Sequence, residues 1–306
     1  MTIEKLVKTI IPTLGIVLTT SLTANAQSNN DDVDEDTLIV APDPAGRAAV
    51  LGINMGINGL VCGITAAVEE RNILHDAGKC MAGGAIQYAG MEMAMHDAPV
   101  LPGIGLRVVE TGTSIVENTL AGREPFEYLH YSLAPVFPGL LQIDTKNQEL
   151  DFYWNIMPWV GLTYNAAEGN DFDILQSLSY QIYVFDAKKD DFGRVGATFG
   201  NIMNYNHDKP NNVAAHEFAH VLQYTRMRPA QQLIPQQVDF VEKILHLRLG
   251  EDIAAYSFWA AKDIGCIARD WEPLCERRWW NLLEAEAYTM ETANEQYKPE
   301  TLRRKK

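Results

Sequence analysis

The chain has 306 residues, enough for a sizeable hydrophobic core and one or two domains. Its 40 acidic residues outnumber its 25 lysines and arginines, so its formal net charge is −15 at pH 7. A surface of this sign repels phosphate backbones, and no basic stripe compensates for it apart from the RRKK sequence at the C-terminus. Charge therefore argues against a nucleic-acid partner.

The first 26 residues have the pattern of a secretory signal peptide. Two lysines precede an uncharged run that ends in the small residues of the Ala24-Asn25-Ala26 sequence. We expect cleavage before Gln27 and an exported protein that resides in the periplasm, in the cell envelope or outside the cell. An uncleaved membrane anchor is the alternative, but the apolar stretch is short for a span. Residues 27–37 are acidic and polar, which predicts a disordered leader.

Export would place the four cysteines in an oxidising compartment, where they can pair. Four cysteines allow three connectivities, and the local pairings Cys62–Cys80 and Cys266–Cys275 are the simplest of them. Neither pair has the C-x-x-C spacing of a structural zinc site, which argues against a metal bound by cysteines.

Residues 38–122 form a glycine-rich region with helical periodicity. Ala48–Val68 contains no charged residue and carries a glycine at about every fourth position. We expect three helices, at about 47–70, 79–96 and 102–121, that pack against one another through their small residues. Such packing occurs both in membranes and in soluble cores, so two interpretations of residues 48–121 stay open. The region either contacts a membrane or forms a tightly packed helical unit inside a soluble domain.

Residues 130–206 are rich in aromatic and β-branched residues, in segments that turn sequences such as KNQ and AEGND separate. This pattern predicts a small antiparallel β-meander, whose last segment, 196–212, places an edge strand just before the next helix. From 211 onward the sequence predicts helices. The expected fold class is therefore α+β, with residues 123–306 as one domain that combines the meander with helices over 211–296.

The segment HEFAH, residues 216–220, has the spacing of a zinc site. Residues four apart on a helix share a face, so His216 and His220 can chelate one ion. Glu217 lies beside them, within reach of a metal-bound water whose proton it would accept. The surrounding positions are mostly apolar, which predicts a buried helix, and buried polar groups need partners. The alternative is a helix whose histidines only form hydrogen bonds in a polar core.

A zinc ion that keeps one position for water needs a third protein ligand. A further histidine six residues after His220 is excluded, because Arg226 stands there. The later sequence NLLEAEAY offers Glu284 and Glu286, which point about 200° apart on a helix, so that one of them faces the metal and the other faces away. We favour Glu284, because it shares a face with Ala287, which lets two helices approach, and with Tyr288, which can hold a ligand from behind.

HEFAHVLQY followed at a distance by LLEAEAY resembles the gluzincin group of zinc metallopeptidases. The resemblance covers about 211–290 and implies His216, His220 and Glu284 as zinc ligands and Glu217 as the general base. Many members have aspartate where this chain has Tyr288, which is kept as a supporting residue. Glu286 is kept as the alternative ligand. The resemblance implies a zincin-like helical part and a hydrolase of peptide bonds, with a peptide or protein substrate. The alternative function is a non-catalytic membrane-associated or interaction protein with a structural zinc site.

Overall fold

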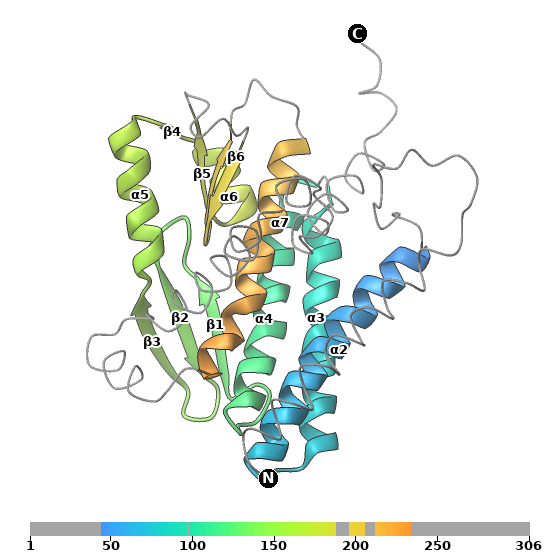
Figure 1. Ribbon diagram of the computed structural model, residues 1–306. Helices are drawn as coiled ribbons and strands as arrows, with labels where there is room; N and C mark the ends of the chain where they lie inside the picture. Colours follow the sequence, from blue (N-terminus) through green and yellow to red (C-terminus); the bar gives the residue numbers. More distant parts are fainter. Residues whose placement is uncertain (1–43, 97, 188–195, 206–211, 234–306) are drawn as a thin grey trace, which may run out of the picture.

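The computed structural model of the chain describes residues 44–96, 98–187, 196–205 and 212–233. Within these residues the fold is mixed α+β, with six α-helices and two small sheets (Figure 1). Several expectations concern other parts of the chain and lie outside the described residues. These are the signal peptide 1–26, the leader 27–37, the pairing Cys266–Cys275, and the helix with Glu284, Glu286 and Tyr288.

Three long helices come first: α2 (Pro44–Val68), α3 (Ile73–Ala94) and α4 (Leu101–Leu120). A three-stranded antiparallel meander follows, with β1 (Tyr128–Ser132), β2 (Gly139–Asp144) and β3 (Glu149–Trp154). The next elements are α5 (Ile156–Glu168), β4 (Asp171–Phe172), α6 (Ile174–Tyr180) and β5 (Tyr183–Asp186). The last are β6 (Gly196–Phe199), β7 (Ile202–Tyr205), α7 (Asn212–Met227) and the 3₁₀ turn η2 (Arg228–Leu233).

The three predicted N-terminal helices are confirmed, and their closest packing joins α3 to α4. A Cβ atom on Gly90 would lie 2.6 Å from the backbone nitrogen of Val109 and 2.7 Å from the carbonyl oxygen of Gly105. Only glycine allows two helix backbones to approach in this way. The glycines of α2 differ among themselves, because a Cβ on Gly52 or Gly56 would meet nothing within 4 Å.

Helix α2 packs against α3 and is joined to it covalently. Cys62 and Cys80 form a disulfide, which is the local pairing expected from the sequence. Nearby, the side-chain amide of Asn58 donates to Gln87 Oε1 over 3.0 Å. Among the described residues, Val50–Val68 is the one stretch long and apolar enough to cross a membrane by length and composition, and 28% of it is buried.

Helix α4 lies along the edge of β1 and supplies the hydrogen bonds that a neighbouring strand would otherwise make. Its residues 110, 114 and 118, each four apart, meet residues 132, 130 and 128 of the strand. Four residues of helix rise about 6.0 Å and two residues of strand about 6.7 Å, so the two repeats match over this length. Ser132 N donates to Glu110 Oε1 (2.8 Å), His130 N to Ser114 Oγ (2.9 Å), and Asn118 Nδ2 to Tyr128 O (2.7 Å).

The prediction of one antiparallel meander over 130–206 was wrong beyond β3. The segment WVGLTYNA belongs to helix α5, in which Pro158, Gly161 and Asn165 are buried at helical spacing. Its aromatic and β-branched residues favour a strand locally, but tertiary packing overrides that preference. Gly161 lies against the Ile202 side chain, and Gly169 ends the helix in the left-handed conformation, with φ 69°.

The second sheet is mixed rather than antiparallel. Its strand order is β4-β5-β7-β6, with β5 parallel to β7 and β6 antiparallel to β7. The segment expected to form one edge strand before α7 contains two strands, which Gly200 joins at a positive φ of 60°. The edge is therefore β6, and β7, which directly precedes α7 among the described strands, lies inside the sheet.

The core that positions α7 lies between α4 and this second sheet. In Figure 1, α7 crosses in front of α4, with the two sheets and α5 on one side of it and α3 and α2 on the other. Phe218 and Leu222 of α7 belong to a buried cluster that includes Val109 of α4, Val184 of β5 and Met203 of β7. The apolar face of α7 is thus fixed inside the protein, which determines where its polar residues point.

Candidate metal centre

The helix that carries HEFAH is buried, as its apolar flanks predicted. Phe218, Ala219 and Leu222 have no exposed surface, and the Tyr180 ring of α6 packs edge-on against Phe218 with 4.7 Å between ring centroids. Glu217 and His220 are also buried, with 7% and 4% of their surfaces exposed. Polar groups at such positions need partners within the protein, so their contacts indicate what the helix can do.

His216 and His220 point their Nε2 atoms at each other. These nitrogens are 3.2 Å apart, and the ring planes meet at 85°. Two histidine nitrogens on a tetrahedral zinc, each about 2.05 Å from the ion, would be separated by roughly 3.3 Å. The observed separation therefore fits two ligands of one ion, and it equally allows one neutral histidine to donate a hydrogen bond to the other.

Glu217 lies on the side of α7 that faces the edge strand β6. The hydroxyl of Thr198 in β6 donates to Glu217 Oε2 over 2.7 Å and also lies 3.0 Å from the Glu217 carbonyl oxygen. The carboxylate is thus held in one orientation by a neighbouring strand. The sequence predicted Glu217 as a general base, and this role stays a prediction.

Gln223 is the second residue in contact with the histidine pair. It is 1% exposed, and its Oε1 lies 2.8 Å from Nδ1 of His220. Neither Thr198 nor Gln223 was predicted to take part in the site.

The third ligand expected from the sequence, Glu284 with Glu286 as the alternative, lies outside the described residues, as does Tyr288. Within the described part of the chain, no group of three histidine, cysteine or acidic side chains converges to hold a metal. The histidine pair and Glu217 are therefore brought together by α7, and the described fold adds Thr198 and Gln223 to them.

The C-terminal end of α7 is fastened by two arginines that were not predicted to have this role. Arg226 donates to the side-chain oxygen of Asn54 in α2 over 2.5 Å. Arg228, only 2% exposed, pairs with the fully buried carboxylate of Glu117 in α4 at 2.9 Å. His130, to which the sequence assigned no role, contacts the same carboxylate through Nδ1 at 2.8 Å. This buried ion pair lacks accessible surface and therefore fixes the helix rather than serving as a site.

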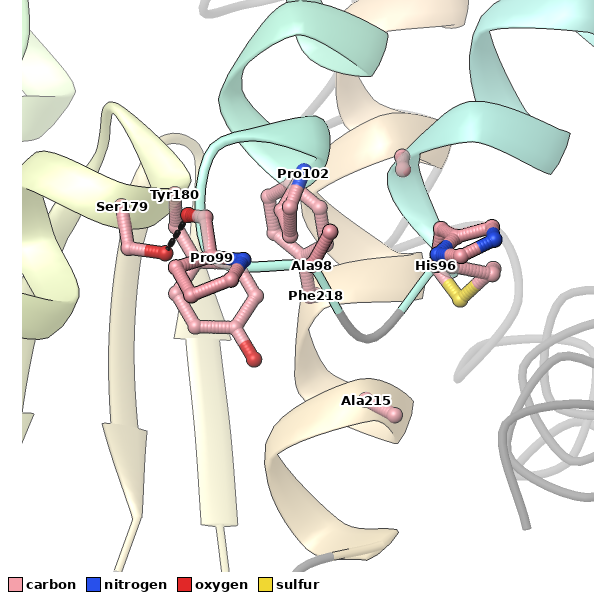
Figure 2. A pocket seen from close by; sticks show the side chains of 10 residues that line it. His96, Ala98, Pro99, Pro102, Ser179, Tyr180, Ala215 and Phe218 are labelled. Carbon is pink, nitrogen blue, oxygen red and sulfur yellow. Dashed lines mark hydrogen bonds between the residues drawn. The ribbon is translucent and has the colours of Figure 1, made fainter. Parts of the chain in front are cut away.

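A cavity of about 120 Å³ lies on another flank of α7 (Figure 2). Ala215 and Phe218 line it from α7, and Pro99, Pro102 and Tyr180 line it from the neighbouring elements. Because each residue of a helix turns it by about 100°, this flank is well separated from the face of the two histidines. Beside the cavity, the Ser179 hydroxyl donates to the Pro99 carbonyl, which ties α6 to the turn before α4.

Comparisons with known protein families, with curated proteins and with solved structures gave no match to this chain.

Proposed function

We propose that the protein is a zinc-dependent hydrolase of peptide bonds, with His216, His220 and Glu284 as the residues that hold the metal. The observation that carries the proposal is the distance of 3.2 Å between the two histidine Nε2 atoms, together with the buried Glu217 at the same helix turn. A helix that only needed to fill the core would have no reason to bury Glu217 and His220 beside the half-buried His216.

Glu217 is the general base of the proposed reaction. Zinc, when bound, would acidify a water and polarise a carbonyl group. Glu217 accepts the proton of the attacking water and later delivers it to the leaving amine. The Thr198 hydroxyl, at 2.7 Å, holds the carboxylate in one orientation beside β6 during both transfers.

A peptide in extended conformation is the substrate class that the surroundings favour. Among the described residues β6 is one of the two outer strands of its sheet, and the Thr198 hydroxyl of this strand bonds to the Glu217 carboxylate. The free backbone groups of an edge strand pair readily with an extended peptide. Such pairing would bring a peptide bond past Glu217 without any requirement for a particular side chain, and the expected export signal would give access to peptides of the envelope or the exterior.

Metal analysis of the purified full chain tests the proposal. We expect one zinc per chain, lost in His220→Ala and kept in His75→Ala, because His75 is an exposed residue at the start of α3. Glu217→Gln should keep the zinc but lose hydrolysis of casein and of a mixed fluorogenic peptide library, because an amide cannot accept the proton.

Two results would contradict the proposal in different ways. Zinc content that is unaffected by His220→Ala would remove the metal site. Wild-type protein that binds zinc, gains thermal stability from it and cleaves none of the probes would support the alternative, a structural zinc in a non-catalytic protein.

A further inference from the structure

His220 is held at both of its ring nitrogens. Its Nδ1 lies 2.8 Å from Oε1 of Gln223, and its Nε2 lies 3.2 Å from Nε2 of His216. Gln223 is one helical turn further along α7, and both side chains are buried, with 1% and 4% of their surfaces exposed. A buried contact of this length is a hydrogen bond that fixes the orientation of the ring.

The chemistry of the two partners determines where the proton of His220 resides. A carbonyl oxygen can only accept, so the hydrogen between Gln223 and His220 belongs to Nδ1 of the histidine. A neutral imidazole carries one such hydrogen, which leaves Nε2 of His220 with a lone pair. We propose that Gln223 is a positioning residue that locks His220 in the Nδ1–H tautomer, so that its Nε2 is ready to bind a metal.

The same assignment determines which of the two histidines donates the hydrogen bond between them. In the metal-free protein His216 donates its Nε2 hydrogen to the lone pair on Nε2 of His220, at the observed 3.2 Å. Binding of a metal between the two nitrogens then requires His216, and not His220, to move its proton to the other ring nitrogen. Gln223 thereby leaves one of the two ligands already in its binding form.

Glutamine suits this role in a buried helix. A carboxylate at the same place would also accept the Nδ1 hydrogen, but it would add an unpaired negative charge to a region with almost no solvent. The neutral amide orients the ring without that cost. The inference about tautomer stands on the apo geometry alone, whereas its effect on metal binding rests on the proposed function.

The tautomer is measured directly by long-range ¹H–¹⁵N NMR on the metal-free full chain labelled at histidine. We expect His220 of the wild type as the Nδ1–H form. Gln223→Leu, which removes the acceptor, should convert it at least in part to the Nε2–H form, and Gln223→Glu should restore the Nδ1–H form. A wild-type His220 in the Nε2–H form, or a tautomer unchanged in Gln223→Leu, would overturn the inference. If Gln223→Leu does not fold, the nearly isosteric Gln223→Met replaces it, and the wild-type spectrum remains decisive.

Zinc affinity, measured by competition with a chelator, provides the second readout. Loss of a group that orients a histidine ligand weakens metal binding by roughly 10- to 100-fold, which we expect for Gln223→Leu, with recovery in Gln223→Glu. The matched control is Gln87→Leu, because Gln87 is equally buried at 1% exposure but bonds to Asn58 and Thr113. That variant should lose stability and keep its zinc affinity.

The two proposals fail differently in this experiment. Wild-type protein that binds no zinc would refute the metal site, and the tautomer measurement alone would then decide the role of Gln223. Equal zinc affinities of the wild type and Gln223→Leu would refute the positioning role of Gln223 and leave the proposed function intact. Equal losses of affinity in Gln223→Leu and Gln87→Leu would assign the effect to general destabilisation and would also refute the positioning role.

Discussion

The hydroxyl of Thr198 and the carboxylate of Glu217 are hydrogen-bonded over 2.7 Å, although the two residues lie in different elements and 19 positions apart. This contact joins the edge strand β6 to the helix that carries the histidine pair. It restricts the Glu217 side chain to one orientation, because the same hydroxyl lies 3.0 Å from the backbone carbonyl of Glu217. The strand that would receive a peptide and the base that would act on it are thus held in one geometry.

Thr198→Val should therefore lower kcat with little change in KM. Valine keeps the shape of threonine but loses the donor, so Glu217 would move between orientations. A misplacement of a catalytic group by about 1 Å costs on the order of 10²-fold, and we expect a loss of roughly 10- to 100-fold. Thr198→Ser, which keeps the hydroxyl, is the matched control and should retain most of the activity. Zinc content should be the same in both variants. Equal kcat values for Thr198→Val and Thr198→Ser would contradict the proposal that the Thr198 hydroxyl orients Glu217.

The backbone contact between α3 and α4 makes Gly90 intolerant of any side chain. In Gly90→Ala the new Cβ would lie 2.6 Å from the Val109 nitrogen and 2.7 Å from the Gly105 oxygen, and neither backbone atom can move without separating the helices. Overpacking of this kind costs about 1–3 kcal/mol, more than the gain of up to about 1 kcal/mol from replacing glycine in a helix. Urea unfolding should show a net loss of stability.

Gly56→Ala in α2 is the control for that experiment. Nothing lies within 4 Å of its Cβ position, so the same substitution should stabilise the protein by up to about 1 kcal/mol. We expect Gly90→Ala to lower the free energy of unfolding and Gly56→Ala to raise it. A similar effect of both would mean that helix propensity, and not the approach of the backbones, sets the outcome.

Two tyrosines give opposite predictions for the loss of a hydroxyl. The Tyr183 hydroxyl is buried and has no hydrogen-bond partner among the described residues, and the same burial raises the pKa of this side chain. The Tyr131 hydroxyl instead lies 3.0 Å from that of Thr111. Tyr183→Phe should leave stability unchanged or raise it by about 1 kcal/mol, whereas Tyr131→Phe should lower it by about 1 kcal/mol. Thermal unfolding of both variants distinguishes them, and a clear loss in Tyr183→Phe would contradict the assignment.

Asp144 should make the turn between β2 and β3 sensitive to acid. It accepts hydrogen bonds from Asn147 N (2.8 Å), Asn147 Nδ2 (2.8 Å) and Lys146 N (2.9 Å). The backbone bond from Asn147 is the largest cause that holds the pKa of Asp144 below its ordinary value of 3.8. The folded state therefore binds the proton less tightly than the unfolded state does. The stability from Asp144 is fully present above pH 3.8 and is lost as the pH falls through the lower, folded-state pKa.

The measurement for Asp144 compares urea midpoints of the wild type and Asp144→Asn at neutral pH and at a series of values below 4. The variant should be the less stable protein at neutral pH, and the difference should shrink as the pH falls, because the asparagine has no charge to lose. A difference that is constant across the series would show that the turn does not depend on ionisation of Asp144.

The amino-acid sequence by itself determined the features that depend on neighbours along the chain. Helical spacing placed His216 and His220 on one face with Glu217 beside them, and the apolar residues around HEFAH predicted that α7 would be buried. Small residues at helical spacing predicted the three packed helices, and a short separation predicted the disulfide between Cys62 and Cys80. Each of these follows from a repeat or a loop of fewer than about 20 residues, within which backbone geometry leaves few alternatives.

Only the tertiary structure decided which distant groups reach the helix. Thr198 is one threonine in a short strand, and no spacing in the sequence connects it with Glu217. Arg228 meets Glu117 across 111 positions, and His130 joins them because α4 lies along the edge of β1. The prediction of a strand in the α5 segment was also wrong. Its aromatic and β-branched residues favour a strand locally, but Gly161 allows a helix to pack closely against Ile202. In each case the deciding energy comes from a contact between segments that the chain order does not bring together, so it exists only once the fold has formed.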